Sequence, residues 1–152
     1  MLNVGIVDYA RIDPVVGYSL GIYLNMAMWI VALTTIAFIA CKSGSSQIYL
    51  LLLSSILLAV FFSSNSGFLF YLLSSLLLTF ICVHFFQNYR KNPQKTTLLV
   101  LVAFIFLLFG KIHFLFSLDH GTYYVIGHIL ELVAYSLIFT NLLLVIRHDK
   151  KA

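Results

Sequence analysis

Charged residues are scarce in this chain of 152 residues. They make up 9% of it, whereas about 25% is usual for a soluble domain. Hydrophobic residues make up 62%, and the mean hydropathy is +1.04. A soluble fold of this length could not hide so much apolar surface in its core. We therefore expect residues 1–152 to form a single membrane domain, with lipid as the main solvent and no separate soluble domain.

Cysteine and recognition motifs are also nearly absent. Cys41 and Cys82 are the only cysteines. They form no C-x-x-C or C-x-x-C-H motif, so we interpret them as small apolar fillers. The N-terminal residues show neither a basic start nor a short apolar core before small residues, so we expect no removable signal peptide. Basic patches with interleaved aromatic residues are missing, which argues against a nucleic-acid partner.

Most of the sequence consists of long apolar runs. Each is close to the roughly 20 residues that cross the hydrocarbon core as a helix. Backbone groups in lipid must be satisfied within the protein, and these runs lack the alternation of a membrane β-barrel. We predict an all-α integral membrane protein, a bundle of five transmembrane helices. The expected helices cover residues 14–41, 47–62, 67–89, 97–117 and 122–147.

The basic residues predict the orientation of these spans. Apart from Lys111 within the fourth run, they fall on one side in a five-helix topology, and only Arg11 lies on the other. The residues on the basic side are Lys42, Arg90, Lys91, Lys95, Arg147, Lys150 and Lys151. Positive residues mark the cytoplasmic side. We expect a multi-pass protein of the plasma (cytoplasmic) membrane, with the N-terminus outside and the C-terminus in the cytoplasm. A re-entrant second segment would put Lys42 and Arg90 on opposite sides, so we expect it to span as well.

Ionisable residues interrupt the last two apolar runs at matching depths. In an antiparallel hairpin, residues equidistant from the turn lie at one level, and this turn is centred near residue 120. At about 1.5 Å per residue, His113 and His128 lie roughly 8–10 Å below the outer end of the hairpin. Lys111 and Glu131 lie roughly 10–14 Å below it. Ionisable groups in lipid are costly, so such a cluster indicates a functional site.

The last run also carries a polar stripe. Its members recur at the spacing of one helix face, and they are Tyr124, His128, Glu131 and Tyr135. We predict a ligand- or proton-binding pocket in the outer leaflet. Its expected residues are Glu131, His128, His113 and Tyr135, with Lys111 and Asn25 nearby. Lys111 and His113 are about 200° apart around their helix, so they cannot both face the same neighbour.

Metal and haem binding are the alternatives for this cluster. His113, His120, His128 and Glu131 could form a transition-metal shell, although their spacing matches no H-E-x-x-H or paired E-x-x-H motif. A b-type haem could use His113 and His128, but packed helices only about 8–10 Å apart would have to splay. The serines lack the glycine-flanked elbow of a hydrolase, which argues against hydrolase chemistry.

Three functions follow as hypotheses. The leading one is a small non-enzymatic subunit or sensor whose pocket binds a ligand, a proton or a metal and acts through a partner. The second is a redox subunit that holds haem or a metal. The third is a purely structural subunit or assembly factor, in which Lys111 or His128 neutralises Glu131. We expect the bilayer and other membrane subunits, or further copies of the chain, as partners.

Overall fold

The computed structural model of the chain describes residues 14–40, 46–117 and 121–149. All regular secondary structure in these ranges is helical, as predicted. The helices are α1 (Pro14–Ala40), α2 (Ser46–Phe61), α3 (Ser66–Lys91), α4 (Lys95–Phe116) and α5 (Gly121–Asp149). Each begins and ends within two residues of its expected bounds.

Four of the described helices are long and apolar enough to cross a membrane. Their qualifying stretches are Leu20–Ala40, Ser66–Lys91, Lys95–Phe116 and Thr122–Arg147. Helix α2 is apolar as well, but it has only 16 residues. Length and composition therefore support the expected membrane character for α1, α3, α4 and α5, and α2 is the short member of the set.

Helix α3 begins and ends at residues with turn chemistry. The side chain of Asn65 accepts a hydrogen bond from the backbone N–H of Phe68 at 3.1 Å, which caps the first turn. The helix stops at Lys91 because Pro93 disfavours helical backbone in the residue before it, and Asn92 is extended. The connection to α4 is consequently short, and α3 and α4 form an antiparallel pair.

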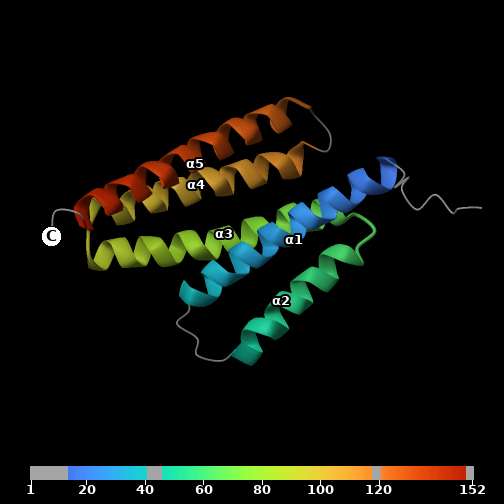
Figure 1. Ribbon diagram of the computed structural model, residues 1–152, viewed down its shortest axis with the longest axis horizontal. Coiled ribbons are helices and arrows are strands. Elements are labelled where there is room, and N and C mark those ends of the chain that lie inside the picture. The colour runs from blue at the N-terminus through green and yellow to red at the C-terminus, as the bar shows by residue number, and fades with distance from the viewer. Residues whose placement is uncertain (1–13, 41–45, 118–120, 150–152) are drawn as a thin grey trace, which may run out of the picture.

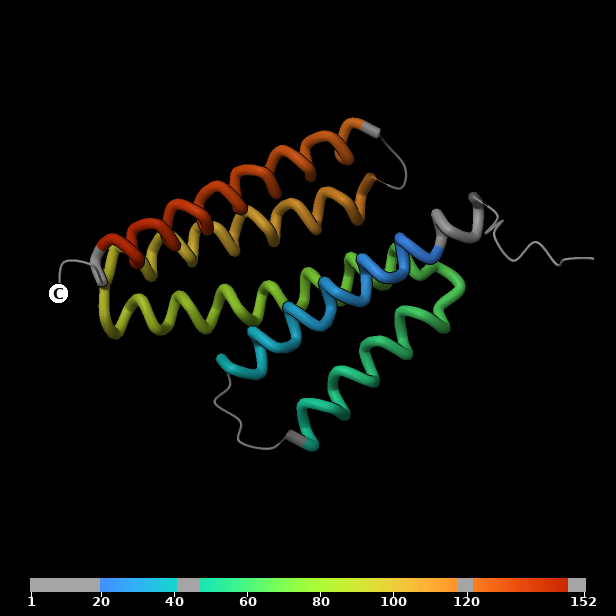
Figure 2. The backbone as a smooth tube through the Cα atoms, viewed as in Figure 1, coloured from blue at the N-terminus to red at the C-terminus, as the bar shows by residue number. Residues whose placement is uncertain are grey.

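Helix α3 lies in the middle of the bundle (Figure 1). Helix α4 packs against both α3 and α5, and α1 packs against both α3 and α2. In the part of the chain that the structure describes, the backbone of α5 comes close only to that of α4. The tube view in Figure 2 shows that successive helices run in opposite directions, so the start of α1, the α2–α3 connection and the adjoining ends of α4 and α5 lie at one end of the bundle.

The interior is small for a chain of this hydrophobicity. One apolar cluster joins α1, α3, α4 and α5 around Leu33, Leu78, Ile81 and Leu107. A second joins α1, α2 and α3, and it consists of Ile30, Val60 and Phe70 with partly buried neighbours. Large apolar side chains cover much of the outer surface, and α5 is the extreme case, since only 6% of its apolar stretch is buried.

Candidate functional site

Helices α4 and α5 approach each other closely at the level of the site. A Cβ atom on Gly110 would lie 3.3 Å from the carbonyl oxygen of Gly127. A Cβ atom on Gly127 would lie 2.7 Å from a ring carbon of Phe114, closer than real Cβ contacts allow. Only glycine leaves room for the two backbones and the Phe114 ring at this level. The approach places Lys111 of α4 directly opposite Glu131 of α5.

Lys111 and Glu131 form a buried ion pair. The Lys111 Nζ donates a hydrogen bond to Glu131 Oε1 at 2.7 Å, and the two side chains are only 4% and 12% exposed. His128 lies one turn earlier on α5, with its Nδ1 3.7 Å from Glu131 Oε2. That distance is too long for a hydrogen bond but short enough for an electrostatic contact when the ring is protonated. The carboxylate is therefore neutralised chiefly by Lys111.

Aromatic rings complete the surroundings of the Lys111 ammonium group. Nζ lies 4.2 Å from the ring centroid of Trp29, 5.5 Å from those of Phe70 and Phe114, and 5.9 Å from that of Tyr71. A cation within about 6 Å of an aromatic face is attracted by the ring quadrupole. One carboxylate and four rings thus replace the water that an exposed lysine would bind.

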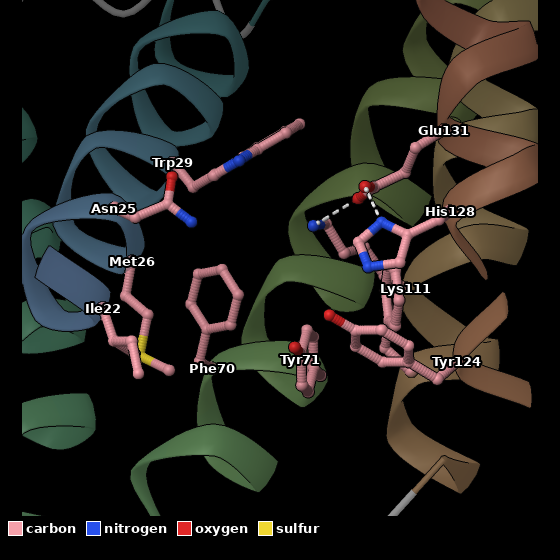
Figure 3. Close-up of a pocket in the computed structure, with 11 residues that line it drawn as sticks. Ile22, Asn25, Met26, Trp29, Phe70, Tyr71, Lys111, Tyr124, His128 and Glu131 are labelled. Atoms are coloured by element: carbon pink, nitrogen blue, oxygen red, sulfur yellow. Dashed lines mark hydrogen bonds and ion pairs between the residues drawn. The ribbon is translucent and has the colours of Figure 1, made fainter. Parts of the chain in front are cut away.

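The ion pair forms one side of a cavity of about 290 Å³. Figure 3 shows α1 on one side, α5 on the other and α3 behind. The lining consists of Ile22, Asn25, Met26 and Trp29 of α1, Phe70 and Tyr71 of α3, Lys111 and Phe114 of α4, and Tyr124, His128 and Glu131 of α5. Four of the five helices therefore contribute to it.

The cavity has a buried floor and an exposed mouth. Phe70 and Phe114 are almost fully buried, as is Lys111, and they belong to α3 and α4. Asn25 of α1 and His128 of α5 are exposed. Since the α1 and α5 backbones do not pack against each other, the cavity opens on the surface between them.

Phe114 organises the rings at the α5 side of the cavity. Its ring stacks on Tyr71 at a centroid distance of 5.4 Å and meets the edge of His128 at 4.8 Å. Tyr124 touches both Phe114 and His128, with centroid distances of 5.7 and 4.4 Å. Such edge-to-face and offset contacts favour defined ring orientations. His128 and Tyr124 are held beside the cavity in this way, although both are half exposed.

The structure brings together four of the six residues expected in the pocket. Lys111, Glu131, His128 and Asn25 all line the cavity. His113 does not: its Nδ1 donates a hydrogen bond to the carbonyl oxygen of Phe109 at 2.8 Å, and its ring lies 6.0 Å from that of Tyr123. The angular separation of His113 from Lys111 explains this, because Lys111 occupies the inward face of α4.

Tyr135 lies outside the cavity lining as well. Its ring packs 6.2 Å from that of Trp29, so it touches the back of one cavity wall. Residue 135 is one helical turn beyond Glu131, which moves it past the level of the ion pair. Tyr135 is therefore a neighbour of the site and not part of the cavity lining.

Among the described residues, those expected to hold a metal do not form a shell. Within the described ranges, no three side chains of His, Cys, Asp or Glu come close enough together to hold an ion. His120 lies outside the described residues. His113 and His128 also have different surroundings, the first beside Phe109 and Tyr123 and the second beside Tyr124 and Glu131. This arrangement supports neither the metal shell nor a haem held between the two histidines.

Sequence reasoning missed the aromatic walls. Trp29 follows Asn25 by four residues, and Phe114 follows Lys111 by three, so each shares a helix face with a polar residue of the site. That spacing was the available signal. The abundance of phenylalanine in residues 104–116 concealed it, because most of those rings serve as apolar bulk.

Comparisons of the chain with protein-family models, with curated proteins and with solved structures find no match.

Proposed function

We propose that this chain is a non-enzymatic binding subunit of the plasma membrane. In this proposal it crosses the membrane five times, with the N-terminus outside and the C-terminus in the cytoplasm. The alternating helix directions and the placement of Arg90, Lys91 and Lys95 at the adjoining ends of α3 and α4 support this orientation. The cavity then lies in the outer leaflet and opens toward the lipid between α1 and α5.

One observation carries the binding function: the ion pair of Lys111 and Glu131 borders a cavity. A pair that served only to join α4 and α5 would need no space beside it, because protein interiors are normally packed without voids. Here the space extends from Glu131 to Asn25 on the far wall, and its mouth is lined by polar side chains. A concave, mostly ring-lined site with a few polar groups is typical of ligand pockets.

The small polar surface of the chain supports action through a partner. The connection between α3 and α4 is short. A ligand-dependent change in the bundle would therefore be passed on through the membrane-facing surface. Helix α5 offers the largest such surface, since it both lines the cavity and is mostly exposed.

Two methionines of α1 provide a matched test. Met26 lines the cavity, whereas Met28 is 66% exposed on the outer surface. We expect Met26→Trp to fill part of the cavity and to reduce the amount of small molecule that copurifies from the native membrane by roughly tenfold, about 1.4 kcal/mol of binding. Met28→Trp should leave that amount unchanged. Mass spectrometry of both purified variants gives the readout, and equal ligand content in the two would refute a binding cavity.

Glu131→Gln separates this proposal from a structural subunit. A purely structural pair predicts that the substitution lowers stability and leaves any bound molecule in place. The binding proposal predicts that the copurifying molecule is reduced even in the fraction of protein that remains folded. Ligand content per folded chain, measured with circular dichroism on the same sample, distinguishes the two.

The topology has its own test. With Cys41 and Cys82 replaced by alanine, single cysteines at Asn65 and Asn92 lie at opposite ends of α3. We expect a membrane-impermeant thiol reagent to label Asn65→Cys from outside intact cells and Asn92→Cys only after lysis. Labelling of both from the same side would exclude the proposed five spans.

A further inference from the structure

The lysine and the carboxylate that line the cavity are already paired with each other. Lys111 is engaged by Glu131 at 2.7 Å and by the Trp29 ring at 4.2 Å. An anionic ligand would have to compete with Glu131 for the ammonium group, and a cationic ligand would have to displace Lys111 from its rings. Separating a buried ion pair costs several kcal/mol. The charge arrangement therefore favours a neutral ligand.

The cavity walls favour a flat ligand. Trp29, Phe70, Tyr71 and Phe114 line the cavity with rings from three helices, and such rings favour offset or edge-to-face contacts with a planar ring. The volume of about 290 Å³ is at the lower end for ligand pockets. It fits the ring-sized head of an amphiphile and not a whole lipid. An apolar tail would leave through the mouth between α1 and α5.

The cavity lining also supplies hydrogen-bonding groups for oxygen atoms on that ring. Tyr71 and Tyr124 carry hydroxyls, and Asn25 carries an amide. Asn25 and Tyr124 are exposed, and Tyr71 is partly buried. Hydroxyl and amide groups can donate to a carbonyl oxygen. A ligand that accepts hydrogen bonds from such groups at an apolar site is stabilised by them.

We infer that the cavity binds the neutral, oxygen-bearing ring of an isoprenoid quinone or a chemically similar amphiphile, with its tail in the lipid. This inference rests on the proposed function and specifies its ligand class. The aromatic walls hold the ring, and the hydroxyl and amide groups of the lining bind its oxygen atoms beside the neutral ion pair. No electron transfer is part of the inference.

Trp29 makes this binding directly measurable, because it is the only tryptophan in the chain and forms a cavity wall. The test uses the full chain in lipid nanodiscs, titrated with a benzoquinone that carries a ten-carbon tail. Quinones quench tryptophan fluorescence at short range. We expect quenching of Trp29 that saturates with the mole fraction of quinone in the lipid.

The matched control moves the reporter by one residue. In the double variant Trp29→Phe, Met28→Trp, the aromatic wall is retained, and the tryptophan lies at nearly the same depth on the lipid-facing surface. Quinone that merely dissolves in the bilayer quenches both proteins alike. We expect half-maximal quenching of Trp29 at a quinone fraction roughly tenfold below that for the control. Equal quenching curves would overturn the inference.

Charged probes and one further variant complete the test. A ten-carbon phosphate ester and a ten-carbon trimethylammonium compound should leave the saturating quinone curve unchanged, and competition by either at equal concentration would overturn the neutral-ring assignment. Tyr124→Phe should weaken quinone binding by roughly threefold to tenfold, the effect of one lost hydrogen bond.

Failure of this inference is distinguishable from failure of the proposed function. If the quinone does not bind but Met26→Trp loses another copurifying molecule, the ligand class is wrong and the binding function stands. If the quinone does not bind and Met26→Trp loses nothing, both are wrong.

Discussion

The α4–α5 hairpin and helix α2 are built from similarly apolar sequence, but they are held in the bundle by different means. The hairpin approaches closely at Gly110 and Gly127 and contains the buried pair of Lys111 and Glu131. Among the side chains of α2 that the structure describes, Val60 is the single fully buried one. The difference teaches that hydrophobicity alone does not position a helix where most of the apolar surface stays exposed. Two helices of this bundle are held in a defined relative position where small residues and a polar pair occur together.

Helix α2 contacts α1 through aromatic rings and through one pair of neighbouring hydroxyl groups. The hydroxyl groups of Thr35 and Tyr49 lie 2.9 Å apart, and the Tyr49 ring packs 5.2 Å from that of Phe38. These contacts are weak compared with a buried ion pair. We therefore expect substitutions in the hairpin to affect stability much more than comparable substitutions in α2.

The largest effect is expected from breaking the ion pair. Glu131→Leu leaves the Lys111 ammonium buried without a counterion, and such changes cost about 3–5 kcal/mol. The double variant Lys111→Met, Glu131→Leu should recover most of that loss, because no uncompensated charge remains. Unfolding in mixed micelles followed by circular dichroism gives both values. If Glu131→Leu were as stable as the double variant, the unpaired Lys111 charge would cost nothing. The ion pair would then not explain a difference in stability between the hairpin and α2.

A smaller loss is expected from the glycine contact. Gly127→Ala places a Cβ atom against the buried Phe114 ring, whereas a Cβ atom on Gly21 meets nothing within 4 Å. We expect Gly127→Ala to be less stable than Gly21→Ala by about 1–3 kcal/mol, the usual cost of overpacking. The same unfolding assay measures the difference. Equal stabilities would mean that Phe114 moves aside freely and that the close approach is not specific.

The attachment of α2 should be weaker still. Tyr49→Phe removes the hydroxyl that meets Thr35, and interhelical hydrogen bonds in membrane proteins are worth about 0.6 kcal/mol on average. Tyr23→Phe is the control, because Tyr23 meets α2 through its ring beside Phe61, which the substitution keeps. A loss of several kcal/mol for Tyr49→Phe would place α2 on a par with the hairpin.

The smallest effects are expected on the exposed surfaces of both regions. Leu51 of α2 is 69% exposed and Leu132 of α5 is 66% exposed. Substitution of either by alanine should change the stability of the purified chain by less than about 0.5 kcal/mol. The two alanine variants should also be compared in the native membrane, where a partner could cover one of these surfaces. A reduced steady-state level for Leu132→Ala alone is the result expected if a partner subunit covers α5.

The sequence predicted the helices well because their causes are local. Runs of apolar residues set their lengths, and residues such as Asn65 and Pro93 set their ends. The level of Lys111 and Glu131 was also predictable, since the symmetry of an antiparallel hairpin depends only on the distance of each residue from the turn. Their contact at 2.7 Å agrees with that expectation.

Composition and local pattern thus determined an all-helical chain with a polar level in its last hairpin. Only the tertiary structure decided which side chains share that level as a site: it admitted Trp29 and Phe114, and it directed His113 and Tyr135 elsewhere. The physical reason is rotation. In a helix that is apolar on nearly every face, hydrophobic periodicity does not choose the inward side, so the choice falls to the close packing of glycines and rings against neighbouring helices.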